Sequence, residues 1–198
     1  MNHPARLVAV LCISTHCLLL STAPSEAQDI KYDYRVLATN RTGTMEKEMN
    51  EAADAGFIFA AVMGGETAFG GNEVVLVMLK DPSRPSEQRR IYRLLATTRT
   101  GTTQKEMQQL GDEGFEYRGQ TVFKSTFGGQ EVSVIMERDT SQPARKTQYR
   151  LLATSRTATM QKELREAGEA GFRLVGMTVG KTAIGGSELV SILQKEGK

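Results

Sequence analysis

Hydrophobic and polar positions recur in the same order three times along the chain. Each copy opens with a short run of β-forming residues, at Tyr34 to Thr39, Tyr92 to Thr97 and Tyr149 to Thr154. The three starting tyrosines are spaced 58 and then 57 residues apart. A fixed period of this size is typical of repeated supersecondary units. The pattern therefore predicts three tandem repeats.

A polar loop and an amphipathic helix follow each opening strand. In the first copy, apolar side chains recur at helical spacing at Met45, Met49, Ala52 and Ala53. The residues predicted to cap the three helices are Thr44, Thr102 and Thr159. A glycine followed by phenylalanine predicts a left-handed stop for each helix, at Gly56, Gly114 and Gly171.

Two further strands complete each copy, at about Phe57 to Met63 and Glu73 to Lys80 in the first, joined by a loop that holds Gly70-Gly71. A helix between the first and second strands favours a right-handed parallel crossover. The third strand returns from a hairpin, so we expect it to run antiparallel between the other two. The predicted fold is α+β: three tandem β-α-β-β repeats, each a three-stranded sheet with one helix, packed pseudo-symmetrically.

The sheet faces that lie opposite the predicted helices differ between repeats. In repeat 1 this face reads as apolar, with Ile58, Ala60, Val62, Val75, Val77 and Leu79, and in repeat 3 with Val175, Met177, Val179, Val190 and Ile192. In repeat 2 it reads as polar, with Glu116, Arg118, Gln120, Ser133 and Glu137. We therefore expect repeats 1 and 3 to bury these faces against each other or a partner chain, and repeat 2 to face water.

The first 27 residues are predicted to be a secretory signal peptide. Arg6 precedes an apolar run from Leu7 to Leu20, and Ser25 and Ala27 suit a cleavage site. The alternative, a retained membrane anchor, needs roughly 18–20 apolar residues. The predicted organisation is a signal peptide at 1–27, repeat 1 at 28–80, a linker at 81–90, repeat 2 at 91–138, a linker at 139–147 and repeat 3 at 148–198. The expected location is the periplasm or the extracellular medium.

Cleavage at this site would change the available chemistry. It would remove every cysteine and histidine, namely Cys12, Cys17, His3 and His16. A mature chain of this kind has no disulfide, no zinc site built on Cys or His and no Ser-His or Cys-His nucleophile. The net charge is only +2 and no long basic run is present, which argues against a nucleic-acid partner. No cofactor, metal site or later membrane span is predicted.

The repeated Arg-Thr loop is the candidate ligand site. An arginine, two hydroxyl groups and free N–H groups at a helix N-terminus suit a phosphate, sulfate or carboxylate. The candidate residues are Arg41, Thr42, Thr44, Arg99, Thr100, Thr102, Arg156, Thr157 and Thr159. The alternative is structural, because caps and turns use the same residue types and each arginine could pair with a recurring glutamate.

Carboxylates offer a second, catalytic hypothesis. A Gly-Gly-x-Glu element precedes the last strand of each repeat, and Glu48 with Glu73 could form an acid pair of the kind that glycosidases use. Three similar sites in one small chain, without a histidine base, are unusual for an enzyme.

Helix positions such as Asn50, Gln108 and Arg165 differ between copies and are expected to be exposed.

The repeats also resemble a known family. Tyr-Arg-Val-Leu at Tyr34, the helix end from Glu48 to Phe57, and Val-Val-Leu-Val-Met-Leu-Lys at Val74 are similar to the small bacterial domain-of-unknown-function family 4177. Phe57, Phe115 and Phe172 stand where that family usually has tryptophan, and the long Arg-Thr loop is not part of its pattern. The resemblance implies a small α+β unit and a bacterial origin, and it implies no catalytic residues.

These observations favour an exported, non-catalytic binding or scaffold module. The alternative is a hydrolase or lyase that uses carboxylates and arginine on an anionic or sugar substrate. The sequence identifies no ligand or partner. An anionic small molecule, another protein and a second copy of the chain all remain open as partners.

Overall fold

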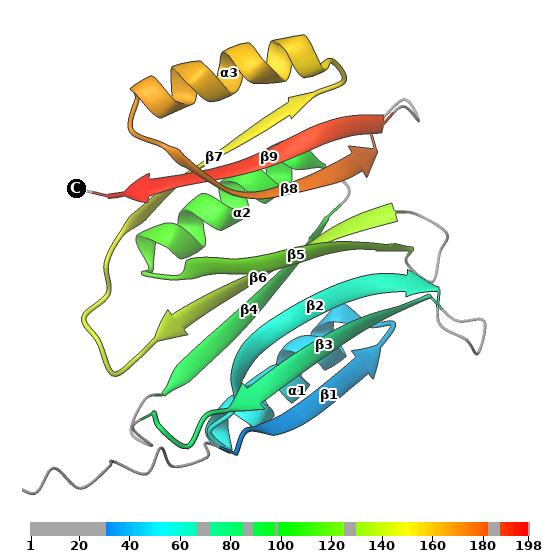
Figure 1. Ribbon diagram of the computed structural model, residues 1–198, viewed down its shortest axis with the longest axis vertical. Helices are drawn as coiled ribbons and strands as arrows, with labels where there is room; N and C mark the ends of the chain where they lie inside the picture. The colour runs from blue at the N-terminus through cyan, green and yellow to red at the C-terminus, as the bar shows by residue number, and fades with distance from the viewer. Residues whose placement is uncertain are drawn as a thin grey trace, which may run out of the picture.

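The computed structural model describes residues 31–66, 72–84, 89–97, 99–124, 130–181 and 187–197. It confirms three β-α-β-β repeats, which are stacked along the long axis of the molecule (Figure 1). The signal peptide predicted at 1–27 and the three Gly-Gly pairs lie outside the described residues.

Each repeat contributes one helix and three strands. Repeat 1 contains β1 (Asp33–Thr39), α1 (Thr42–Asp54), β2 (Ile58–Glu66) and β3 (Asn72–Lys80). Repeat 2 contains β4 (Arg90–Thr97), α2 (Thr100–Asp112), β5 (Glu116–Lys124) and β6 (Gln130–Asp139). Repeat 3 contains β7 (Thr147–Thr154), α3 (Thr157–Glu169), β8 (Arg173–Lys181) and β9 (Ser187–Glu196).

The three sheets share one topology. Their strand orders are β1-β3-β2, β4-β6-β5 and β7-β9-β8, and every pairing is antiparallel. The first two strands of each repeat are therefore parallel, with the third strand inserted between them. This arrangement confirms the predicted crossover and hairpin.

The helix stops are also confirmed. Gly56, Gly114 and Gly171 have φ values of 87°, 88° and 83°, in the region that glycine tolerates. The Phe57 N–H donates to the Ala52 carbonyl at 3.0 Å, which closes the last turn of α1 in the manner of a Schellman motif.

A β-bulge in the second strand of each repeat changes which residues share a face. The register shifts between Phe59 and Ala61, between Tyr117 and Gly119, and between Leu174 and Gly176. We call the face that carries a repeat's own helix the helix side, and the opposite face the open face. The open face of β2 consists of Ile58, Ala61 and Met63, since these pair with Leu79, Val77 and Val75.

The predicted open faces are therefore partly wrong. Val62 pairs with Leu76, Gln120 with Val134, and Met177 and Val179 with Ser191 and Leu189, which places all four on helix sides. A bulge inserts one extra residue, and the simple two-residue alternation of a strand fails beyond it.

The repeats stack so that the helix side of one packs on the open face of the next. A first core cluster joins Met45, Met49 and Phe57 of repeat 1 to Tyr92 and Ile135 of repeat 2. A second joins repeat 2 to repeat 3 in the same way; its members from the two repeats include Met107, Phe115, Met136, Tyr149 and Ile192. The helices α1 and α2 are each covered on both sides, by their own sheet and by the next repeat.

Repeat 2 consequently lies between repeats 1 and 3, and the prediction that its polar face meets water is wrong. Ser133 and Glu137, on that open face, are only 2% and 4% exposed. The prediction that repeats 1 and 3 bury their faces against each other is wrong for the same reason. A polar face can be buried here because its charged groups are paired with one another, as described below.

Candidate functional site

The Arg-Thr loops lead directly into the three helices. Arg41, Arg99 and Arg156 are the N-cap residues, with extended backbones and no side-chain cap hydrogen bond. The hydroxyl oxygen of the threonine two residues earlier accepts from each arginine N–H, at 3.2 Å for Thr39 and Arg41, 3.1 Å for Thr97 and Arg99, and 3.2 Å for Thr154 and Arg156.

The predicted caps at Thr44, Thr102 and Thr159 are therefore wrong. Each helix begins two residues before that position, at Thr42, Thr100 or Thr157. The preceding threonine hydroxyl forms a turn that holds the arginine backbone extended, and an extended residue at that point starts the helix earlier.

The three loops belong to successive layers, one in each repeat. Arg41, Arg99 and Arg156 are all exposed. Arg99 and Thr100 line a cavity of about 20 Å³ together with Gly180 and Val190 of repeat 3; neither Arg41 nor Arg156 lines it. This cavity thus holds one loop arginine, and it is too small for more than a water-sized ligand.

The first residue of α2, Thr100, contacts a carboxylate group of the protein itself. The Thr100 hydroxyl donates to the Glu188 carboxylate at 2.7 Å. Glu188 is the glutamate of the Gly-Gly-x-Glu element in repeat 3. A carboxylate at a helix N-terminus is favourable, and here it joins two repeats. The two repeated motifs are therefore parts of one contact between repeat 2 and repeat 3.

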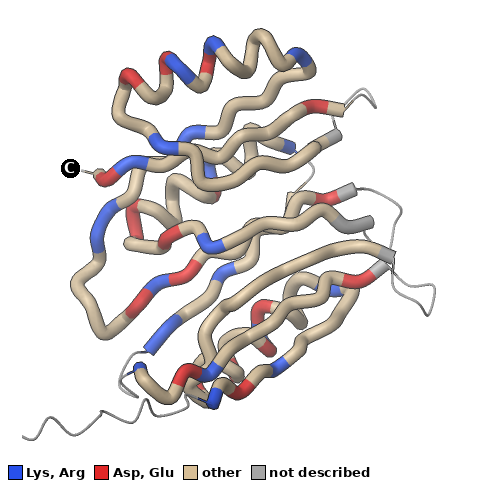
Figure 2. The backbone as a smooth tube through the Cα atoms, in the orientation of Figure 1, with Lys and Arg blue, Asp and Glu red and all other residues tan. Residues whose placement is uncertain are grey.

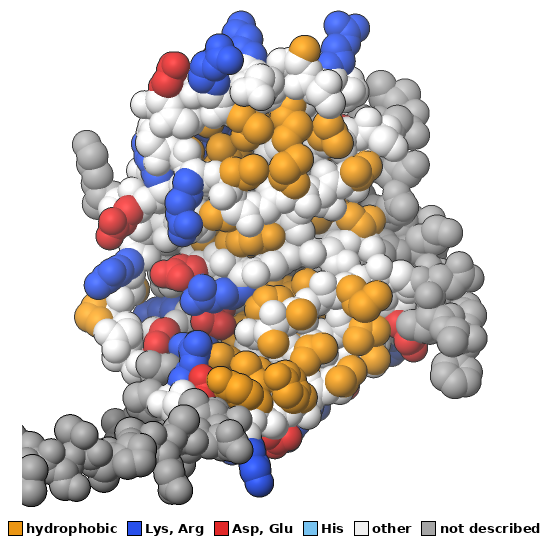
Figure 3. All heavy atoms as spheres, viewed as in Figure 1, with side chains coloured by type: hydrophobic (Ala, Val, Ile, Leu, Met, Phe, Trp, Pro, Cys, Tyr) orange, Lys and Arg blue, Asp and Glu red, His pale blue; other side chains and the backbone are white. Residues whose placement is uncertain are grey.

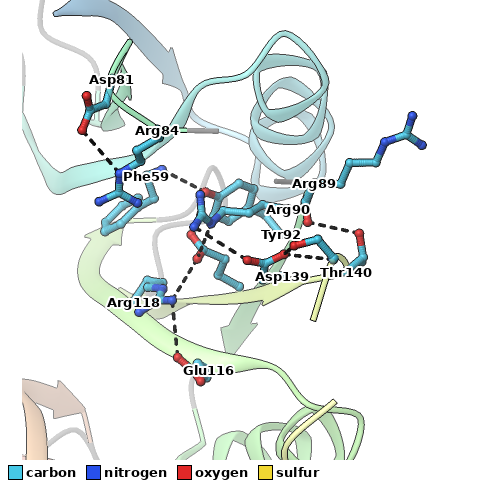
Figure 4. A network of polar contacts seen from close by, with 12 residues as sticks. Phe59, Asp81, Arg84, Arg89, Arg90, Tyr92, Glu116, Arg118, Asp139 and Thr140 are labelled. Carbon is cyan, nitrogen blue, oxygen red and sulfur yellow. Dashed lines mark hydrogen bonds and ion pairs between the residues drawn. The ribbon is translucent and has the colours of Figure 1, made fainter. Parts of the chain in front are cut away.

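A cluster of charged groups lies on the open face of repeat 2, toward repeat 1 (Figure 4). Glu137 accepts from Arg90 Nε at 3.0 Å and pairs with an Arg118 guanidinium nitrogen at 2.9 Å. The other Glu137 oxygen accepts from the Tyr92 hydroxyl at 2.7 Å. Both carboxylate oxygens are thus occupied by partners on the same sheet.

This cluster also reaches repeat 1. The Tyr92 oxygen accepts a hydrogen bond from the Phe59 N–H at 2.9 Å, at the bulge of β2. Around its rim, Arg118 pairs with Glu116 at 3.4 Å and Arg90 lies 4.0 Å from Asp139. The cluster therefore joins the open face of repeat 2 to the strand that covers it.

The electrostatics of the cluster act on Tyr92 and Arg118. Burial and the neighbouring Glu137 carboxylate raise the pKa of Tyr92 well above its ordinary value, so the phenol stays neutral. Burial alone would lower the pKa of Arg118, but Glu137 and Glu116 outweigh this effect and raise it overall. Neither group exchanges a proton near neutral pH.

A cavity of about 310 Å³ opens beside the cluster. Its walls carry both signs of charge, from Arg90, Arg118, Arg145, Glu116, Glu137 and Asp139. The linker residues Gln142 to Ala144 close one side. Within the described ranges, no group of three or more Cys, His, Asp and Glu side chains is arranged to hold a metal ion.

The structure reveals contact residues that sequence reasoning placed elsewhere. Arg90 was expected in a linker, but it opens β4 and joins the charged cluster. Asn50 and Gln108 were expected to be exposed, which is wrong. Asn50 accepts from the Tyr92 N–H at 2.9 Å and donates to the Tyr92 carbonyl at 3.1 Å, and Gln108 accepts from the Tyr149 N–H at 2.9 Å. Asn50 and Gln108 hold the same position in the first two helices. This repeated amide side chain is the feature of the sequence that could have indicated the contact.

Comparisons with protein-family models, with curated proteins and with solved structures found no match for this chain. The resemblance to the 4177 family stays a prediction. Among the helices that the structure describes, none is long and apolar enough to cross a membrane.

Proposed function

We propose that this protein is a non-catalytic scaffold or binding module that acts outside the cytoplasm. The observation that carries the proposal is the pairing of Glu137, whose two oxygens accept from Arg90 and Tyr92 and pair with Arg118. A general acid or base must offer a free position to a substrate. Here the most buried carboxylate of the described residues instead holds the Tyr92 hydroxyl, whose oxygen accepts from the Phe59 N–H of repeat 1. The predicted signal peptide supports the location.

The charge distribution supports a scaffold as well. Figure 2 shows residues of both signs spread over all three repeats, with both signs along α3. Such a surface produces no single strong field that would attract one highly charged partner. A stack of this kind would instead recognise its partner by shape and by apolar contacts.

An activity screen tests the proposal. The protein is incubated with a panel of glycosides, uronides and phosphate esters, beside the Glu137→Gln variant and a buffer blank. We expect no turnover above the blank for either protein. Turnover by the wild type that Glu137→Gln abolishes, with the circular dichroism spectrum retained, would establish the hydrolase or lyase alternative.

That alternative has one specific observation in its favour. Glu116 and Asp139 both line the cavity of about 310 Å³, beside Arg118 and Arg145. Glu116→Gln and Asp139→Asn are therefore included in the screen, because an activity that used the rim of this cavity would survive Glu137→Gln and fail in one of them.

The Arg-Thr loops remain a second candidate for binding. Their arginines are exposed at the ends of three helices, so an anion could be contacted at several layers at once. Thermal unfolding with phosphate, sulfate and acidic sugars tests this: a ligand at one hundred times its dissociation constant stabilises by about 2.7 kcal/mol. A shift that is lost when Arg41, Arg99 and Arg156 are replaced by glutamine would support the loops as a site.

A further inference from the structure

The stacking contact occurs twice among the described residues. The helix side of repeat 3 and the open face of repeat 1 are the two halves of the same contact, and each carries exposed large hydrophobic side chains in the described part of the chain. These surfaces lie toward opposite ends of the long axis (Figure 1). We call the open face of repeat 1 the head surface, marked by Tyr34, Val36 and Met63. The tail surface is the helix side of repeat 3, marked by α3, Leu174 and Met177.

The head surface has the residues of an internal contact without its cover. Tyr92 and Tyr149 are 0% and 4% exposed where the preceding repeat covers them, whereas Tyr34 at the same position is 62% exposed. Val36 and Met63 on the same face are also exposed. Figure 3 shows hydrophobic side chains gathered over the sheet of repeat 1.

The tail surface is uncovered in the matching places. Phe59 and Tyr117 lie at the bulges of β2 and β5 and pack into the two core clusters. Their counterpart in β8 is Leu174, which is exposed together with Met177 and Val179. A second group of hydrophobic side chains is visible between α3 and β8 in Figure 3. Large exposed apolar groups that gather in this way mark interaction surfaces.

The polar half of the contact is preserved too. In α2, Gln104 donates to the Tyr149 carbonyl at 2.8 Å and accepts from the Leu151 N–H, so it binds the free edge of β7. Gln161 occupies the same position in α3 and is exposed. Likewise Thr100 binds Glu188, and the corresponding positions are held by Thr157 in repeat 3 and Glu73 in repeat 1.

A small residue in α3 points to the same contact. Gly111 of α2 has no room for a side chain, because a Cβ there would lie 2.9 Å from the Tyr149 ring. Gly168 holds the same position in α3, and nothing lies within 4 Å of the place where its Cβ would be. Glycine weakens a helix interior, and at Gly168 no contact among the described residues requires it.

From this continuity we propose that a second copy of the chain docks head to tail. The tail surface of one copy covers the head surface of the next and repeats the internal contact between repeats. The inference deepens the proposed scaffold role and rests on it. A heterologous contact of this kind does not end with two copies, so it produces longer assemblies or closed rings.

At one position the new contact differs from the internal ones. Asn50 and Gln108 both donate and accept, whereas Arg165 at the same place in α3 can only donate. It retains a donor for the Tyr34 carbonyl, and the neighbouring Asp33 provides a carboxylate on the same strand. Association is therefore expected to weaken as salt is added.

Two variants each block one surface. Gly168→Gln places a bulky polar side chain on the tail surface, where no described residue lies within 4 Å of the Cβ position. Val36→Glu places a charge on the head surface at an exposed position. Lys162→Gln is the matched control on α3, because its counterpart Lys47 stays 77% exposed even in the covered helix α1, and Lys162 is 78% exposed.

Sedimentation velocity of the full chain over a concentration series provides the first readout. We expect the wild type and Lys162→Gln to grow in mass with concentration, and Gly168→Gln and Val36→Glu to remain monomers with unchanged circular dichroism. When the two blocked variants are mixed, each still has one intact and complementary surface, so they should form a one-to-one dimer and no larger species.

Other outcomes overturn the proposal. A wild type that stays monomeric at every concentration removes self-association, while leaving the non-catalytic role intact. Assembly that persists in either blocked variant alone shows a contact between like surfaces or elsewhere. Catalytic turnover in the activity screen would reject the scaffold role without changing the sedimentation result, so the two failures are distinguishable.

Discussion

The phenol oxygen of Tyr92, in repeat 2, lies 2.9 Å from the backbone nitrogen of Phe59, in repeat 1. Tyr149 makes the same contact one repeat later, with the Tyr117 N–H at 2.8 Å. The bulge in each second strand presents an N–H group, and the tyrosine that opens the next repeat accepts from it. This pair of contacts defines the register in which the three repeats stack.

Removing the Tyr92 hydroxyl should destabilise the stack. In Tyr92→Phe, the half-buried Phe59 N–H and one oxygen of the buried Glu137 lose their partner, and leaving buried polar groups unsatisfied costs about 1–3 kcal/mol. Urea unfolding measures this change. Tyr34→Phe is the matched control, since Tyr34 is exposed and should change the free energy of unfolding by less than about 0.5 kcal/mol. Equal effects of the two changes would contradict this account.

The charged cluster should be sensitive to the loss of its central carboxylate. Glu137→Gln leaves Arg90 and Arg118 without their main counter-charge, and breaking a buried pair costs about 3–5 kcal/mol. We expect about 3 kcal/mol, because Arg118 is partly exposed. The control is Glu51→Gln, which removes an exposed pair with Lys47 and should cost no more than about 1 kcal/mol. Chemical unfolding of both variants decides between a structural and a dispensable cluster.

Two glycines at the same helix position should respond in opposite directions. Gly111→Ala forces a methyl group against the Thr147 carbonyl and the Tyr149 ring, so overpacking of about 1–3 kcal/mol is expected. Gly168→Ala meets nothing within 4 Å and should stabilise α3 by about 0.5–1 kcal/mol. At concentrations where the chain is monomeric, melting temperatures should therefore fall for the first variant and rise for the second. A rise for both would show that α2 can move away from β7.

The alkaline limit of stability should depend on the buried tyrosines. Burial raises the pKa of Tyr117 and Tyr149 from the ordinary 10.0 to about 12. Because the folded value is raised, the stabilising effect is complete below pH 10 and is lost as the pH rises through about 12. In that interval the free energy of unfolding should decline less steeply in Tyr149→Phe than in the wild type. A parallel decline in both would contradict a role for this phenol.

Much of each repeat could be predicted locally. The helices, the left-handed stops at Gly56, Gly114 and Gly171, and the central position of the third strand follow from neighbouring residues and from short connections. The start of α1 could not, because the choice between Arg41 and Thr44 as the cap depended on a hydrogen bond from the Arg41 N–H to the Thr39 hydroxyl oxygen, which spacing does not reveal. The Arg-Thr loops were recognised as a repeated motif, whereas the charged cluster around Glu137 was missed.

The loops were recognised and the cluster was missed because the loops are local in sequence, whereas the cluster depends on contacts between residues far apart in the sequence. By itself the sequence determined three copies of one small unit, since strand, helix and stop signals each act within a few residues. Only the tertiary structure decided which faces are covered, because the bulge at Phe59 redirects side chains and the pairing of Tyr92 with Glu137 joins residues from different strands. A polar face such as that of repeat 2 is compatible with water or with a paired interior, and only the partners that surround Glu137 make burial the more stable choice.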